Sequence, residues 1–342
     1  MKLTFRWYGE NDPVTLEKIR QIPTVSGIVS AVYDVKPGEV WSENSINKIK
    51  SQASENGLEF EVVESVPVPE EIKLGTRDAD RLIDNYCENL KRLSKAGVKC
   101  VCYNFMPVFD WLRSNLEFKH SDGSNSLAYN EKDVLKMNPL KSELSLPGWD
   151  ESYSKEELKN LLKEYENIDE EKLFLNAKRF LQAVIPVAEQ CGIKMAIHPD
   201  DPPWSIFGLP RIITNEENIE KYLNLYKSEA NGLTLCTGSL GANPDNDMVE
   251  FAKKFALRTP FLHLRNIKIT GEKQFYETAH PAECGSLDMP NIVKALVKGG
   301  FDGYVRPDHG RMIWGEVGRY GYGLFDRALG AMYIKGLFDA VK

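Results

Sequence analysis

The sequence lacks any apolar run long enough to cross a membrane. A transmembrane helix needs about 20 consecutive apolar residues, whereas charged residues make up 27% of this chain of 342 residues. The first six residues already contain Lys2 and Arg6, and they include no apolar core of the kind that a signal peptide carries. We therefore expect a cytoplasmic protein without a membrane partner.

Positively charged residues are fewer than negatively charged ones. Lysine and arginine number 43 against 50 aspartates and glutamates, which gives a formal net charge of −7. Nucleic acids are bound mainly through clusters of lysine and arginine, so the sequence predicts no nucleic-acid partner. A small anionic substrate remains compatible with this balance, because a local group of arginines is enough to bind it.

Cysteine and histidine are scarce, with six and five copies. Most of the cysteines lie in apolar stretches, as Cys100 and Cys102 do, where a reduced thiol packs as a small apolar group. The sequence contains no glycine-rich phosphate loop and no internal repeat. In a cytoplasmic protein the cysteines are expected to be core residues or metal ligands rather than disulfides.

Short β-branched runs alternate with amphipathic helical stretches along the chain. We predict eight strands, over residues 3–7, 27–32, 60–63, 99–103, 194–198, 233–236, 261–264 and 303–306. One helix is expected to begin at Thr76 or Asp78 and to end near residue 96. Four others are expected to cover residues 170–190, 216–228, 245–255 and 289–298. Eight strand–helix units predict an α/β protein with a closed (β/α)8 (TIM) barrel, formed by one domain over residues 1–342.

Residues 112–155 interrupt this alternation after the fourth predicted strand. They are rich in serine, asparagine, lysine and glutamate. An insertion after a barrel strand lies at the C-terminal face, where barrel enzymes carry their active sites. The insertion is therefore either a lid over the site or a solvated excursion.

Four side chains that can bind metals lie at or just past predicted strand ends, at intervals of about one strand–helix unit. They are His198, Cys236, His263 and Asp308. Each alone is more typical of a core or surface residue, but the ends of successive barrel strands converge at one mouth. Imidazole, thiolate and carboxylate together suit a divalent transition metal better than Ca²⁺ or Mg²⁺. Their shared position therefore predicts a metal site.

Further residues near the predicted metal site are candidates for catalysis or substrate binding. His309 follows Asp308 and cannot share its direction, which leaves it free for acid–base chemistry. Tyr322 lies between two glycines, in a loop that either aims the phenol at the mouth or anchors the last helix. Arg265 and Arg306, at the seventh and eighth strands, either clamp a substrate carboxylate or form salt bridges in the barrel wall.

Four more residues complete the candidates. Trp7 ends the first strand and either packs on a sugar face or joins the core. Asn104 follows the fourth strand and suits a contact with a substrate hydroxyl. Of the remaining histidines, His120 is expected to be solvated in the insertion. His280 either lines the mouth or lies in a surface turn, and the turn is the expected position.

With these residues in place, the chain resembles the mannonate dehydratase family of xylose-isomerase-like barrels nearly end to end. The resemblance rests on residues 5–9 (FRWYG), 11–14 (NDPV), 37–41 (PGEVW), 103–107 (YNFMP), 198–203 (HPDDPP), 209–211 (LPR), 236–239 (CTGS), 263–266 (HLRN), 285–289 (GSLDM), 306–311 (RPDHGR) and 322–324 (YGL). Together these segments are highly specific. One departure is Tyr33 and Asp34, which stand where a histidine-containing stretch is expected after the second strand, so a substrate contact from that loop is in question.

The resemblance implies a hydro-lyase that dehydrates D-mannonate, a sugar acid, to 2-keto-3-deoxy-D-gluconate in hexuronate (glucuronate) breakdown. It also implies Mn²⁺ or Fe²⁺ as the cofactor. By that pattern the metal ligands would be His198, Cys236, His263 and Asp308, and the proton-transfer groups His309 and Tyr322. A homo-oligomeric assembly is compatible with this assignment.

Two other functions stay open at this point. The first is a metal-dependent sugar isomerase or epimerase on the same barrel, although such sites favour carboxylate-rich ligand sets and this one offers Asp308 and a thiol. The second is a non-catalytic barrel that binds a metal or a sugar. Structural zinc normally fills four positions with cysteine and histidine, which would leave His309 and Tyr322 without a purpose.

Overall fold

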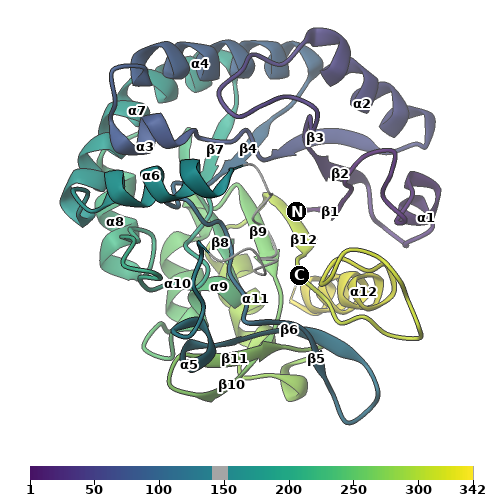
Figure 1. Ribbon diagram of the computed structural model, residues 1–342. Coiled ribbons are helices and arrows are strands. Elements are labelled where there is room, and N and C mark those ends of the chain that lie inside the picture. Colours follow the sequence, from purple (N-terminus) through teal and green to yellow (C-terminus); the bar gives the residue numbers. More distant parts are fainter. Residues whose placement is uncertain (141–152, 342) are drawn as a thin grey trace.

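The computed structural model describes residues 1–140 and 153–341. Eight parallel strands close into a barrel in the order β1-β12-β9-β8-β7-β4-β3-β2 (Figure 1). Their bounds are β1 Lys2–Arg6, β2 Gly27–Ser30, β3 Glu59–Glu64, β4 Cys100–Tyr103, β7 Lys194–Ile197, β8 Asn231–Cys236, β9 Phe261–Leu264 and β12 Tyr304–Pro307. The predicted barrel is confirmed, and every predicted strand matches an observed one to within two residues at either end.

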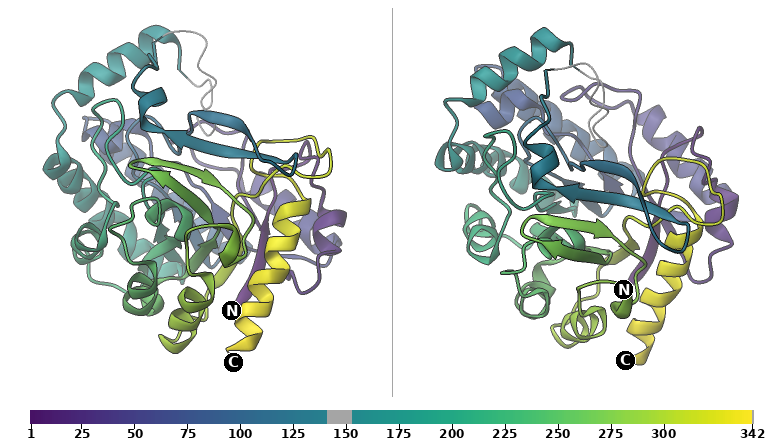
Figure 2. Two further views of the ribbon diagram at one scale, coloured as in Figure 1. Left: turned by 90° about the horizontal axis from the view of Figure 1, so that it is seen from below. Right: turned by 60° about the horizontal axis from the view of Figure 1, so that its bottom comes forward.

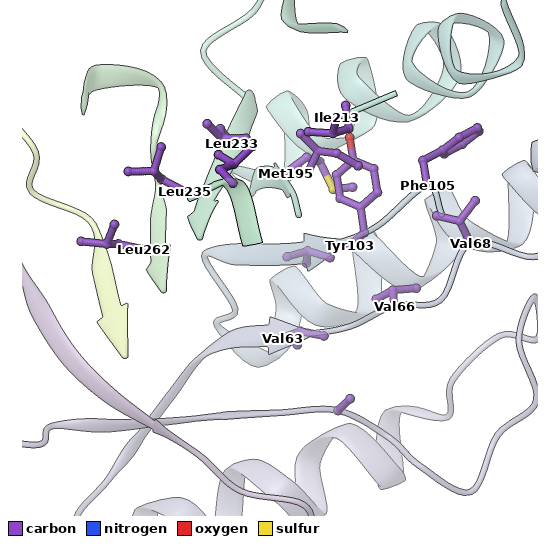
Figure 3. Close-up of a cluster of buried hydrophobic side chains, with 14 of the residues drawn as sticks. Val63, Val66, Val68, Tyr103, Phe105, Met195, Ile213, Leu233, Leu235 and Leu262 are labelled. Carbon is purple, nitrogen blue, oxygen red and sulfur yellow. The ribbon is translucent and has the colours of Figure 1, made fainter. Parts of the chain in front are cut away.

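The barrel strands are buried on both faces, which is why they appear in the sequence as apolar runs rather than as alternating patterns. All four residues of β4 and of β9 are buried. Figure 3 shows part of this core, with Tyr103, Met195 and Leu233 on neighbouring strands. The Tyr103 hydroxyl lies 3.0 Å from that of Tyr222 on a surrounding helix, so strand and helix are joined by a hydrogen bond within the core.

Helices surround the barrel (Figure 1). They are α1 Leu16–Arg20, α2 Glu43–Glu55, α3 Glu70–Leu74, α4 Ala79–Ala96, α5 Glu131–Val134, α6 Lys155–Tyr165, α7 Glu170–Cys191, α8 Glu216–Asn224, α9 Thr237–Leu240, α10 Met248–Phe255, α11 Met289–Lys298 and α12 Phe325–Ala340, with 3₁₀ turns at Ala256–Arg258 and Ala282–Cys284. The long helix α7 starts at a side-chain cap from Asp169 and ends at Gly192, whose φ of 63° suits glycine. In the part of the chain that the structure describes, no helix is long and apolar enough to cross a lipid bilayer.

A second, antiparallel sheet is formed by two hairpins that are far apart in the sequence. Strands β5 (Asn115–Lys119) and β6 (Asn125–Asn130) follow β4, and β10 (Ile267–Gly271) and β11 (Gln274–Glu277) follow β9. They pair in the order β10-β11-β6-β5, at one side of the barrel (Figure 1 and Figure 2).

The insertion after the fourth barrel strand is therefore confirmed, but its pairing with a hairpin after β9 was not predicted. The assignment of residues 112–155 to a lid stays a prediction, and residues 141–152 of that segment lie outside the described residues.

Candidate active site

The four predicted metal ligands meet at the C-terminal ends of β7, β8, β9 and β12. Nε2 of His198 lies 3.2 Å from Nδ1 of His263, and Sγ of Cys236 lies 3.5 Å from Oδ2 of Asp308. That carboxylate oxygen is 3.9 Å from Nδ1 of His263. Donor atoms of His198, Cys236 and His263 all lie within 4.8 Å of one another. These three residues form a possible metal site, and Asp308 lies directly beside it.

The environment of His198 fits a metal-ligating role. Its Nδ1 lies 2.7 Å from the carbonyl oxygen of Pro199. A carbonyl only accepts hydrogen bonds, so Nδ1 carries the proton and Nε2 presents its lone pair to the cluster. A soft thiol and two imidazoles are donors that divalent transition metals bind well.

A second group of potential ligands, Glu64, Cys102 and His263, shares one histidine with the first. Burial raises the pKa of the Cys102 thiol well above its usual value, which keeps it protonated. Both oxygens of Glu64 accept hydrogen bonds from Arg306, at 3.0 and 2.8 Å. Because metals bind thiolates rather than thiols, this second group is the poorer site.

His309 and Tyr322 form a hydrogen-bonded pair next to the cluster. Nε2 of His309 lies 2.8 Å from the Tyr322 hydroxyl, and both side chains are buried. The Tyr322 ring also contacts the ring of Tyr8 edge-on, with 5.0 Å between centroids. Burial raises the pKa of Tyr322 well above its usual value, so the phenol is protonated at neutral pH.

The other nitrogen of this imidazole is held by a residue that the sequence did not single out. Nδ1 of His309 lies 2.7 Å from Oε1 of Glu277, at the end of β11. Nη1 of Arg265 lies 2.6 Å from the same oxygen. A carboxylate oxygen only accepts, so the tautomer with its proton on Nδ1 satisfies Glu277 and leaves Nε2 to accept from Tyr322. Nη1 of Arg265 also lies 2.7 Å from Nδ1.

Glu277 belongs to a buried ionic network of two arginines and two carboxylates. Arg113, just before β5, donates to Glu277 at 2.8 Å and to both oxygens of Asp201 at 2.8 and 3.0 Å. Arg265 also donates to Asp201, at 2.5 Å. All four side chains are at most 2% exposed. The network thus ties the antiparallel sheet to the barrel and to His309.

These charges also act on the carboxylates themselves. Burial favours protonation of Asp308, but the electrostatic influence of the neighbouring His309 and Arg306 outweighs it and holds the pKa of Asp308 well below its usual value. Burial opposes ionisation of Glu277 too, yet the neighbouring His309 and Arg265 lower its pKa. Both groups therefore stay anionic at neutral pH.

A cavity of about 810 Å³ opens above these groups. The predicted site residues in its wall are Asn104, His198, Arg306, Asp308, His309 and Tyr322. Tyr33 and Asp34 also line it, so the loop in which the sequence departs from the family pattern does face the cavity.

Two residues predicted to contact substrate, Trp7 and Arg265, lie outside the described cavity wall. Within the described residues Trp7 is not part of the cavity wall, and it lies in the core with 4% of its surface exposed. Arg265 is likewise absent from the described wall, because its guanidinium is engaged by Asp201 and Glu277.

Two histidines differ from expectation. His280 is buried rather than placed in a surface turn, because its ring packs against Gly330 of α12, where a Cβ atom would come within 2.3 Å of the ring. His120 is only partly exposed, since its ring packs against Phe118 and Tyr276 and bonds to the Ser126 hydroxyl.

The parallel eight-stranded barrel, the possible His–Cys–His metal site and the buried His–Tyr pair define a TIM-barrel protein with a candidate active site at the C-terminal ends of its strands. The fold agrees with a xylose isomerase domain protein from Planctomyces limnophilus, which is 10% identical with a TM-score of 0.58 and matches over 99% of this chain and 98% of that one. The model of the family D-mannonate dehydratase (UxuA) matches residues 1–342. The chain belongs to this family of hydro-lyases.

Close relatives agree with this assignment. A mannonate dehydratase from Streptococcus agalactiae serotype V is 56% identical over 343 aligned residues, which cover 100% of this chain and 99% of that protein. The crystal structure of mannonate dehydratase from Streptococcus suis serotype 2 is 48% identical with a TM-score of 0.93, and the match covers 100% of this chain and 95% of that one.

Proposed function

We propose that this chain removes water from D-mannonate to give 2-keto-3-deoxy-D-gluconate, as a cytoplasmic enzyme of hexuronate breakdown. The observation that carries the proposal is the His309–Tyr322 pair beside the donor atoms of His198, Cys236 and His263, in a chain of the D-mannonate dehydratase family.

We further propose Mn²⁺ or Fe²⁺ as the cofactor, with Asp308 as the fourth ligand beside His198, Cys236 and His263. The support is the donor set, in which two imidazoles, a thiol and an anionic carboxylate meet. When bound, such an ion supplies Lewis acidity that stabilises negative charge developing on a substrate oxygen.

The reaction demands two proton transfers. The C2 proton lies α to a carboxylate and is weakly acidic, so a base must remove it. The C3 hydroxyl is a poor leaving group, so an acid must protonate it as it departs. Positioned groups of this kind typically contribute about 10²–10⁴-fold each in rate.

In the proposed mechanism, His309 and Tyr322 supply these two functions. Nε2 of His309 carries the basic lone pair of this ring in the tautomer whose proton Glu277 holds on Nδ1. The Tyr322 hydroxyl is protonated and donates to that nitrogen. This arrangement favours His309 as the base at C2 and Tyr322 as the acid at the C3 hydroxyl.

Two outcomes of one experiment test the reaction. With D-mannonate in D₂O, elimination gives an enol with its hydroxyl on C2, and its ketonisation places a solvent proton on C3. At early times the product should have lost one water and carry one deuterium at C3, as seen by mass spectrometry and NMR. A product that keeps all its oxygen atoms would indicate an isomerase or epimerase, and unchanged substrate would indicate a binding protein. Either result contradicts the proposal.

A further inference from the structure

Arg6, the last residue of β1, has a buried guanidinium that lines the cavity. Its side chain is 8% exposed and belongs to the cavity wall. Nε and Nη1 are buried, and within the described residues neither donates a hydrogen bond. Nη1 lies 3.5 Å from Oε2 of Glu64, close enough for an ion pair but without hydrogen-bond geometry. Buried donors are normally satisfied, so this guanidinium has hydrogen-bonding capacity that the described residues do not use.

The two arginines that the sequence suggested as carboxylate clamps are already engaged by the chain. Arg306 donates to both oxygens of Glu64, and its Nη1 lies 2.8 Å from Oδ1 of Asp308. Arg265 is held by the ionic network described above. Arg306 is therefore paired with both Glu64 and Asp308, whereas Arg6 lies 3.5 Å from Glu64 and shares that carboxylate with Arg306. The charge of Arg6 is the less fully offset of the two, which suits an anion.

Arg6 also lies close to the groups assigned to the reaction. Its guanidinium packs over the Tyr8 ring, 4.7 Å from the centroid, and that ring contacts Tyr322. On its other side, Glu64 lies 3.4 Å from Nε2 of His263. Stacking on an aromatic ring fixes the plane of a guanidinium and leaves its edge free for a planar anion.

We infer that Arg6 binds the carboxylate of the sugar-acid substrate, an inference that rests on the proposed function. A guanidinium matches a carboxylate with paired donors. Loss of the C2 proton moves negative charge into this carboxylate, so Arg6 stabilises the transition state more than the ground state. Arg6 thus selects an acid over the corresponding neutral sugar alcohol.

The test compares two ligands of equal chain length, D-mannonate and uncharged D-mannitol. Binding is measured by calorimetry on metal-loaded protein with His309→Asn in the background to prevent turnover, and kcat and KM are measured without it. Arg6→Gln should weaken D-mannonate binding at least about tenfold and leave D-mannitol binding unchanged. Arg6→Lys should recover part of the loss. Arg179→Gln, an exposed position on α7, serves as the control and should change neither ligand.

Thermal unfolding and metal content identify variants that fail to fold. If Arg6→Gln fails to fold, the binding of the two ligands is compared in Arg6→Lys instead. Equal losses for both ligands would overturn the inference in favour of a contact with a hydroxyl, and no loss for either would remove Arg6 from substrate binding. If the unmodified protein does not dehydrate D-mannonate, the proposed function fails. The preference for acid over alcohol still tests Arg6 in that case.

Discussion

Replacing Glu277 should lower both the stability of the fold and the rate of catalysis. Oε1 of Glu277 accepts hydrogen bonds from Arg113, Arg265 and His309, and the carboxyl group is 1% exposed. Removing one partner of a buried ionic network typically costs about 3–5 kcal/mol, which we expect for Glu277→Ala in urea unfolding. His309 would also lose the acceptor that fixes its proton on Nδ1, so kcat should fall by about 10²-fold or more, with a smaller change in KM.

The control for this prediction is another buried carboxylate. Asp200 pairs with Arg211 at 3.3 Å and accepts from the backbone of Ile213 at 2.7 Å. Among the described residues it makes no hydrogen bond to His309. Asp200→Asn should lower stability while kcat stays near normal. Glu277→Gln keeps an acceptor of the same shape and should restore part of kcat. A folded Glu277→Ala protein with normal turnover would refute the positioning role of Glu277.

Three further predictions concern the same site. Cys236→Ser should lower the content of bound metal, because a neutral hydroxyl replaces a thiolate. If elemental analysis finds the metal content unchanged, Cys236 is a core residue and not a metal ligand. His309→Asn and Tyr322→Phe should keep fold and metal but lose at least about 10²-fold in kcat, and near-normal turnover would remove that residue from the mechanism. The free energy of unfolding should fall as pH drops below about 4, because the native pKa values of Asp308 and Glu277 lie below those of the unfolded chain. The ionised carboxylates contribute fully to the free energy of unfolding above their pKa values in the unfolded chain, and this contribution is lost as the pH falls through their pKa values in the native protein. A free energy of unfolding that stays constant across acidic pH in urea unfolding would contradict the lowered pKa values.

The barrel and the group of potential metal ligands were predictable because their signals are local. A strand buried on both faces leaves an apolar run, and a polar residue that ends such a run stands out. Cys236 and His263 end or interrupt runs of this kind. Barrel closure then brings the ends of neighbouring strands together without further information from the sequence.

The residues that support the cluster had no local signal of this kind. Glu277 and His280 lie in a polar stretch that is typical of a surface turn. Their burial depends on distant partners, since β11 pairs with β6 and Gly330 of α12 accommodates the His280 ring. Arg113 lies in the insertion, where composition alone indicates solvent exposure. Such partners become visible only when the tertiary contacts are known.

The antiparallel sheet therefore contributes more than a cover at one side of the barrel. Arg113 comes from the segment after β4 and Glu277 from the segment after β9, and these two charges meet only because β6 and β11 pair. Each charge is offset by the other and by Asp201 and Arg265 of the barrel. A displacement of the sheet would leave buried charges unpaired, which is costly. The proposed base, His309, is thereby held by two insertions of the barrel at once, and its orientation depends on residues that no single strand–helix unit supplies.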